Sequence, residues 1–101
     1  MALKDNVDRG KTDKLFKAIM CLESIDECYA FFEDLCTISE VSELSDRFGI
    51  ALSLDRGSTY AEVGKDTGAS SATVSRVKKF LTFGAGGYKL VIKRLKERKE
   101  I

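Results

Sequence analysis

Histidine, proline and tryptophan are absent from this 101-residue chain, and cysteine occurs only three times. Without histidine, the chain cannot build a Cys-His or Ser-His nucleophile pair or an H-E-x-x-H zinc site. It has no glycine-rich phosphate loop, and its acidic pairs at residues 26–27 and 33–34 are more simply explained as solvated helix positions. The sequence therefore predicts a protein that is not an enzyme and that uses no cofactor or metal.

The three cysteines, Cys21, Cys28 and Cys36, lack the C-x-x-C spacing of zinc and redox sites. We interpret them as structural thiols in a reducing compartment. The longest apolar runs are only a few residues long, and no signal peptide opens the chain. We therefore expect a cytoplasmic protein with no membrane partner.

Hydrophobic residues recur at helical spacing along the chain, and glycine is concentrated after residue 48. This pattern predicts an all-α fold. Residues 1–10 are polar and are expected to be flexible, whereas residues 11–101 should form one helical domain. Within that domain we expect dimerisation helices over 11–57 (12–22, 24–35 capped by Ser24, and 39–55 opened by Ser39), a helix-turn-helix over 58–83 and a basic amphipathic helix over 86–100.

Residues 59–77 have the spacing of a helix-turn-helix. Gly68 can adopt the left-handed backbone angles that a tight corner between two helices requires. Val63 precedes this glycine by five residues, while Val74 and Val77 follow it by six and nine, so three valines can meet between the helices. Each helix also begins after a residue that can act as its N-cap, namely Thr59 and Ser70.

The outer face of the second helix suits a major groove. At about 100° per residue, the side chains opposite the valines are those of Ala72, Ser75, Arg76 and Lys79, with Thr73 on the flank. Alanine can touch a thymine methyl, serine can donate or accept, and arginine and lysine can reach guanine edges or phosphates. Residues 69–77 include no acidic side chain that would repel phosphate. We therefore predict sequence-specific binding to double-stranded DNA.

Charge is divided unevenly along the chain, although its total is only +1. Residues 1–46 hold 5 Lys/Arg against 11 Asp/Glu, a net −6, and residues 47–101 hold the remaining 12 against 5, a net +7. A positive half can contact phosphates while an acidic half keeps the rest of the surface away from DNA. A charge-segregated surface without a ligand has the same composition, so charge supports the DNA interpretation without deciding it.

Two other interpretations stay open. The glycine corner could join an ordinary antiparallel hairpin whose polar face is merely solvated. A helical protein-interaction module without DNA binding would use the same fold, with its basic half against an acidic partner. Indifference to DNA in a low-salt gel shift would favour that module.

Apolar side chains are more numerous than one small monomer can bury. The two N-terminal helices are rich in them, and the last helix carries a stripe formed by Tyr88, Val91, Ile92 and Leu95. We therefore expect an extensive two-fold contact between identical subunits. In such a homodimer the two reading helices would lie about 34 Å apart and recognise a palindromic operator.

Some of these residues also carry a family resemblance. Residues 68–76 resemble the reading unit of the tryptophan repressor, and residues 27–38, 59–60 and 67–70 resemble the YerC/YecD family of tryptophan-repressor-like proteins. The resemblance covers about residues 11–95. It implies about six helices in an intertwined homodimer that regulates transcription, with repression as the expected action. Spacing and resemblance together indicate a DNA-binding set of Thr59, Tyr60, Ser70, Ser71, Ala72, Thr73, Ser75, Arg76 and Lys79.

The resemblance further implies a ligand pocket. The repressor's tryptophan pocket falls on Thr37, Arg47, Arg76, Val77 and Phe80. The first three fit the family's pattern, but Val77 stands where the family has a glycine that makes room for the indole, and Phe80 where it has a serine. We expect the larger side chains to fill this vestigial pocket, so that tryptophan is not a corepressor; the sequence does not reveal whether another small molecule acts as an effector.

Overall fold

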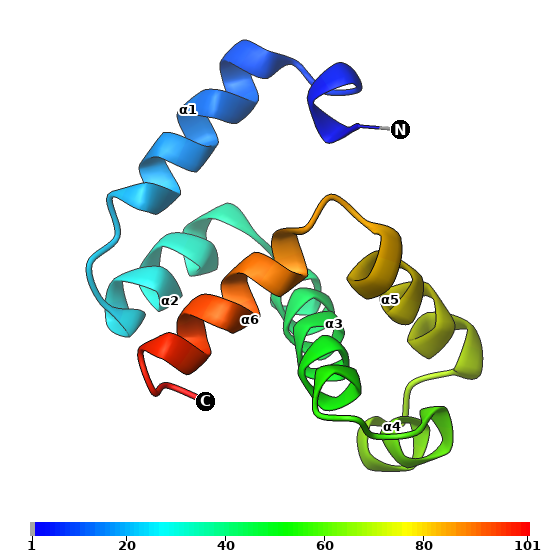
Figure 1. Cartoon of the computed structure of the whole chain (residues 1–101). Coiled ribbons are helices and arrows are strands. Elements are labelled where there is room, and N and C mark those ends of the chain that lie inside the picture. The colour runs from blue at the N-terminus through cyan, green and yellow to red at the C-terminus, as the bar shows by residue number, and fades with distance from the viewer. Residues whose placement is uncertain (1) are drawn as a thin grey trace. The chain divides into compact units, whose positions relative to one another are not determined.

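The structure, a computed structural model, describes residues 2–101 and contains helices and no strand in that range (Figure 1). A short 3-10 helix, η1 (Leu3–Asp5), precedes six α-helices. These are α1 (Arg9–Met20), α2 (Ile25–Leu35), α3 (Ile38–Asp55), α4 (Tyr60–Thr67), α5 (Ser71–Phe83) and α6 (Gly87–Glu97). The predicted all-α fold of about six helices is confirmed.

The described chain divides into two compact units, residues 2–41 and Ser42–Ile101, with the division inside α3. In the first unit, neither α1 nor α2 contains a buried side chain. Its large apolar residues are instead exposed in the single chain, including Phe16, Met20, Ile25, Tyr29 and Leu35. The second unit holds the core and every element of the predicted helix-turn-helix.

Helix starts in the first unit follow from side-chain caps. The predicted Ser24 cap is confirmed, because its hydroxyl accepts a hydrogen bond from the Glu27 N–H at 3.1 Å. The first helix begins earlier than the predicted residue 12, because Asp8 accepts from the Lys11 N–H at 3.0 Å. Residues 9 and 10, expected to be flexible, therefore lie in α1; Met1 lies outside the described residues.

The third helix begins at Ile38, so the prediction that Ser39 opens it is wrong. Thr37 accepts a hydrogen bond from the Glu40 N–H at 3.1 Å, and the Glu40 carboxylate accepts one from the Thr37 N–H at 2.8 Å. This reciprocal pair satisfies two backbone donors that a helix start leaves free. Ser39, in turn, lies inside the helix.

The core of the second unit brings together side chains from four helices. They are Ile50, Ala51 and Leu54 of α3, Val63 of α4, Val74, Val77 and Leu81 of α5, and Ile92 of α6. Phe48 and Tyr88 pack against this core with stacked rings 6.5 Å apart. The Lys96 ammonium also pairs with the Asp55 carboxylate at 2.6 Å. α6 is therefore attached to α3 at two separate points.

Within residues 2–101, no helix is long and apolar enough to cross a membrane. In the same range, no group of three or more histidine, cysteine or acidic side chains is placed to hold a metal ion.

Candidate nucleic-acid interface and the adjoining hollow

The corner between α4 and α5 has the backbone that the sequence predicts. Gly68 lies in the left-handed region with φ of 72°, and its N–H donates to the Gly64 carbonyl at 2.9 Å. Val63 and Val74 are fully buried and Val77 is 4% exposed. The predicted valine contact between the two helices is therefore confirmed, and it fixes which face of α5 turns inward.

Both predicted N-caps of the helix-turn-helix are present. The Thr59 hydroxyl accepts from the Glu62 N–H at 3.1 Å, and the Glu62 carboxylate accepts from the Thr59 N–H at 2.9 Å. The Thr59 backbone N–H, and then its hydroxyl, hold the pKa of Glu62 below its ordinary value. At α5, Ser70 accepts from the Thr73 N–H at 3.2 Å. The α5 start is therefore capped without an acid.

The outward face of α5 is free of acidic side chains along the whole helix. All nine residues of the predicted DNA-binding set are exposed, from Thr59 and Tyr60 at the start of α4 to Lys79 on α5. This surface is chemically suitable for contact with phosphates and base edges. It combines the N–H groups of a helix start with neighbouring hydroxyls and, further along the helix, a cationic side chain.

Arg76 also makes a contact within the chain. Its guanidinium lies over the Phe80 ring, 5.7 Å from the ring centroid, one helical turn further along α5. It also lines a hollow of about 470 Å³. The structure thus places Arg76 beside the predicted ligand-pocket residues as well as on the exposed surface of α5.

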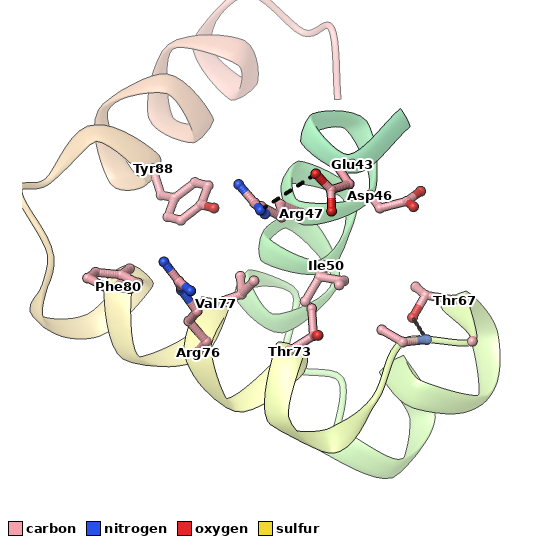
Figure 2. Close-up of a pocket in the computed structure, with 12 residues that line it drawn as sticks. Glu43, Asp46, Arg47, Ile50, Thr67, Thr73, Arg76, Val77, Phe80 and Tyr88 are labelled. Atoms are coloured by element: carbon pink, nitrogen blue, oxygen red, sulfur yellow. Dashed lines mark hydrogen bonds and ion pairs between the residues drawn. The ribbon is translucent and has the colours of Figure 1, made fainter. Parts of the chain in front are cut away.

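The hollow lies wholly within the second unit (Figure 2). Phe80, Arg76 and Tyr88 gather at one end, and Thr67 lies at the other. The lining residues are Glu43, Asp46, Arg47 and Ile50 of α3, Thr67 to Ala69 at the corner, Thr73, Arg76, Val77 and Phe80 of α5, and Tyr88 of α6.

Four of the five predicted pocket residues line this hollow, namely Arg47, Arg76, Val77 and Phe80. The fifth, Thr37, belongs to the other compact unit, where it caps α3. Val77 and Phe80 do not fill the space, because Val77 is buried in the core and Phe80 is 46% exposed beneath the Arg76 guanidinium. These two side chains, which are larger than the family's glycine and serine, thus lie around the hollow and leave it open.

Charged groups dominate one wall of the hollow. Arg47 lies 4.0 Å from the Glu43 carboxylate, and Asp46 is the next acid on the same helix. Glu43, Asp46, Arg47 and Ile50 have the i, i+3, i+4, i+7 spacing of one helix face, and this spacing could have identified them as a group. No local pattern indicates that Tyr88 and Thr67 join them, since α6 and the corner meet this face only through tertiary packing.

Comparison with known proteins agrees with this architecture. The sequence profile of the family described as "Trp repressor protein" matches residues 10–96. The chain belongs to the Trp repressor family. It is 47% identical to "Uncharacterized protein YerC" of Bacillus subtilis (strain 168) over 90 residues. This matched region is 88% of this chain and 86% of that protein.

Two solved structures of Trp repressor type are similar to this chain. One is a candidate Trp repressor from Staphylococcus aureus, with a TM-score of 0.89 and 40% identity over 95% of this chain and 96% of that one. The other is a TrpR-like protein from Eubacterium eligens ATCC 27750, with a TM-score of 0.83 and 46% identity over 86% of this chain and 90% of that one. The predicted resemblance to the YerC group of Trp-repressor-like proteins is confirmed.

Proposed function

We propose that this protein is a sequence-specific DNA-binding transcriptional regulator, with repression as its expected action, that acts as a homodimer on a palindromic operator. The observation that carries the proposal is the exposed, acid-free face of α5, held outward by the Gly68 corner and the buried valines. The Trp repressor family to which the chain belongs supports the same function. Cytoplasmic location is part of the proposal, because a regulator of this kind meets its DNA there.

The first experiment recovers DNA bound to the protein in cells and searches the fragments for a palindrome. Binding to that sequence and to a scrambled duplex is then measured by fluorescence anisotropy at several salt concentrations. We expect the affinity for both duplexes to fall with salt, because phosphate contacts release counterions, and the palindrome to bind at least about a thousandfold more tightly. If neither duplex binds at low salt, the protein-interaction module becomes the better proposal.

The α5 face can be tested with a single charge. Ala72→Asp places an acid in the first turn of α5. There its negative charge interacts favourably with the helix dipole but repels DNA phosphates. We expect an unchanged or slightly higher thermal midpoint together with a loss of at least about tenfold in operator affinity. Ala85→Asp adds the same charge at an exposed position between α5 and α6 and should leave affinity nearly unchanged. Equal effects of the two variants would contradict the proposed interface.

Within the DNA-binding set, we propose that the Arg76 side chain lines the hollow and does not read a base. Its stacking on Phe80 supports this assignment, since a guanidinium held there must leave the ring before it can reach a guanine. Arg76→Ala should therefore weaken operator and random DNA by similar factors. A loss confined to the operator would restore the original prediction that this side chain reads a base.

Tryptophan is not the corepressor in this proposal. The Arg76 guanidinium lies over the Phe80 ring, where an indole would otherwise stack, and the charged side chains of Glu43, Asp46 and Arg47 line one wall of the hollow. Calorimetry with tryptophan should give no heat of specific binding, and tryptophan should not change operator affinity. Saturable binding that raises operator affinity would remove this part of the proposal while leaving DNA binding intact.

A further inference from the structure

One side-chain hydroxyl links the end of α4 to the segment that leads into α5. The Thr67 hydroxyl donates to the Val63 carbonyl at 2.6 Å and accepts from the Ala69 N–H at 3.2 Å. It therefore joins the last turn of α4 to the first residue after the glycine corner. Figure 2 shows the second of these bonds as the dashed line beside Thr67.

The geometry of the corner explains why the Ala69 N–H is available to the Thr67 hydroxyl. A helix can end with a glycine whose N–H bonds back to a carbonyl four residues earlier, as Gly68 does with Gly64. In this arrangement the following N–H has no helical carbonyl within reach. Among residues 2–101, the Ala69 N–H indeed donates to Thr67 and to no backbone carbonyl. Thr67 thus holds within the chain a donor that the corner would otherwise leave to solvent.

The position of Ala69 controls the start of α5. Ala69 is partly buried against the core, and the next residue, Ser70, is the N-cap of α5. Fixing the Ala69 amide therefore fixes the point from which the outward face of α5 begins. The valines determine how closely the two helices pack, whereas the hydroxyl determines how the connecting backbone enters the second helix.

We infer that Thr67 is a positioning residue for DNA recognition: its hydroxyl sets the angle at which α5 presents its outward face to the groove. The inference rests on the proposed DNA-binding function. Sequence readout requires the face to be placed within a fraction of an ångström of the base edges, whereas phosphate contacts tolerate more freedom. Loss of the hydroxyl should therefore reduce specific binding more than general binding.

The test compares Thr67→Val, which replaces the hydroxyl by a methyl group of similar shape, with Thr67→Ser, which keeps it. We expect Thr67→Val to lower affinity for the recovered operator about tenfold and affinity for scrambled DNA by less than about twofold. Thr67→Ser should restore most of the operator affinity. Thr82→Val is the matched control for the loss of a threonine hydroxyl, because Thr82 is exposed on α5 and its side chain makes no hydrogen bond within residues 2–101.

Amide hydrogen exchange at Ala69 measures the bridge without DNA. Exchange should be faster in Thr67→Val than in the parent protein and slow again in Thr67→Ser, while the Val63 and Val74 amides keep their protection. Unchanged exchange at Ala69, or equal losses on operator and scrambled DNA, would overturn the inference. If the parent protein binds no DNA, the proposed function fails, and the exchange data still show whether the hydroxyl holds the corner.

Discussion

Two glycines show how differently the same residue type can act in this protein. Gly68 has a positive φ of 72°, whereas Gly49 lies inside α3 with ordinary helical backbone. A Cβ atom added at either position meets no atom within 4 Å. The effect of a methyl group at each site is therefore decided by backbone conformation alone, with no contribution from a steric clash.

Substitution by alanine should consequently change stability in opposite directions at the two glycines. Gly68→Ala should lower the free energy of unfolding by about 1–2 kcal/mol, because an L-residue is strained in the left-handed region. Gly49→Ala should raise it by about 0.5–1 kcal/mol, because alanine loses less entropy in a helix. Urea denaturation of both variants measures these differences. A destabilised Gly49→Ala would show instead that α3 is closely covered at that point in solution.

Single residues also show what the sequence could and could not predict. The caps at Thr59 and Ser70 and the corner at Gly68 were predictable, because each depends on neighbours only a few residues away. Arg76 was placed correctly on the outer side of α5, but its preference for Phe80 depends on the direction of a long flexible side chain. Helical spacing gives the position of Cβ and leaves that direction open.

At the level of helices, two threonine–glutamate capping pairs control where helices start. Thr37 and Glu40 form one at α3, and Thr59 and Glu62 form the other at α4. Hydrogen bonds from each threonine, first from its backbone N–H and then from its hydroxyl, hold the pKa of the glutamate below the ordinary value. Each charged carboxylate therefore stabilises the folded state.

The lowered pKa values predict a loss of stability in acid. The contribution of each pair is complete above the ordinary glutamate pKa of about 4 and disappears as the pH falls through the lower folded-state value. Glu62→Gln keeps a hydrogen-bond acceptor but does not titrate, so its thermal midpoint should fall less between neutral pH and about pH 3. Glu100→Gln, beyond the end of α6, is the control and should follow the parent protein. Parallel curves for Glu62→Gln and the parent would contradict this assignment.

Packing between helices accounts for what local patterns missed. The hollow arises because α3, the corner, α5 and α6 meet around charged side chains, so it depends on contacts distant in sequence. Judged by size alone, Val77 and Phe80 should have closed it. Val77 lies in the core and Phe80 lies under the Arg76 guanidinium, so neither side chain occupies the hollow itself.

At the scale of the whole molecule, all the buried side chains among residues 2–101 come from the second unit, while α1 and α2 contribute none. Isolated helices of 12 and 11 residues are marginally stable in water. We therefore propose that these helices are stabilised by burial of their exposed apolar residues against a second copy of the chain, in a homodimer.

This proposal predicts a stability that depends on protein concentration. Raising the concentration about a hundredfold should raise the thermal midpoint by several degrees, because a partner that binds only the folded chain stabilises it by mass action. Circular dichroism melts across that range, with sedimentation velocity for the mass, test the expectation. The control is Phe16→Glu, which places a charge on an exposed apolar position of α1 and should abolish the concentration dependence. A monomer with a constant midpoint would refute the proposal.

If the protein is the dimeric regulator proposed above, the unburied helices α1 and α2 have a consequence for gene control. If they become ordered only on pairing, then at low expression the amount of paired protein rises with the square of the number of chains made. Operator occupancy would then respond steeply to small changes in synthesis or turnover. A threshold of this kind would require no small molecule, because the abundance of the protein would itself be the signal.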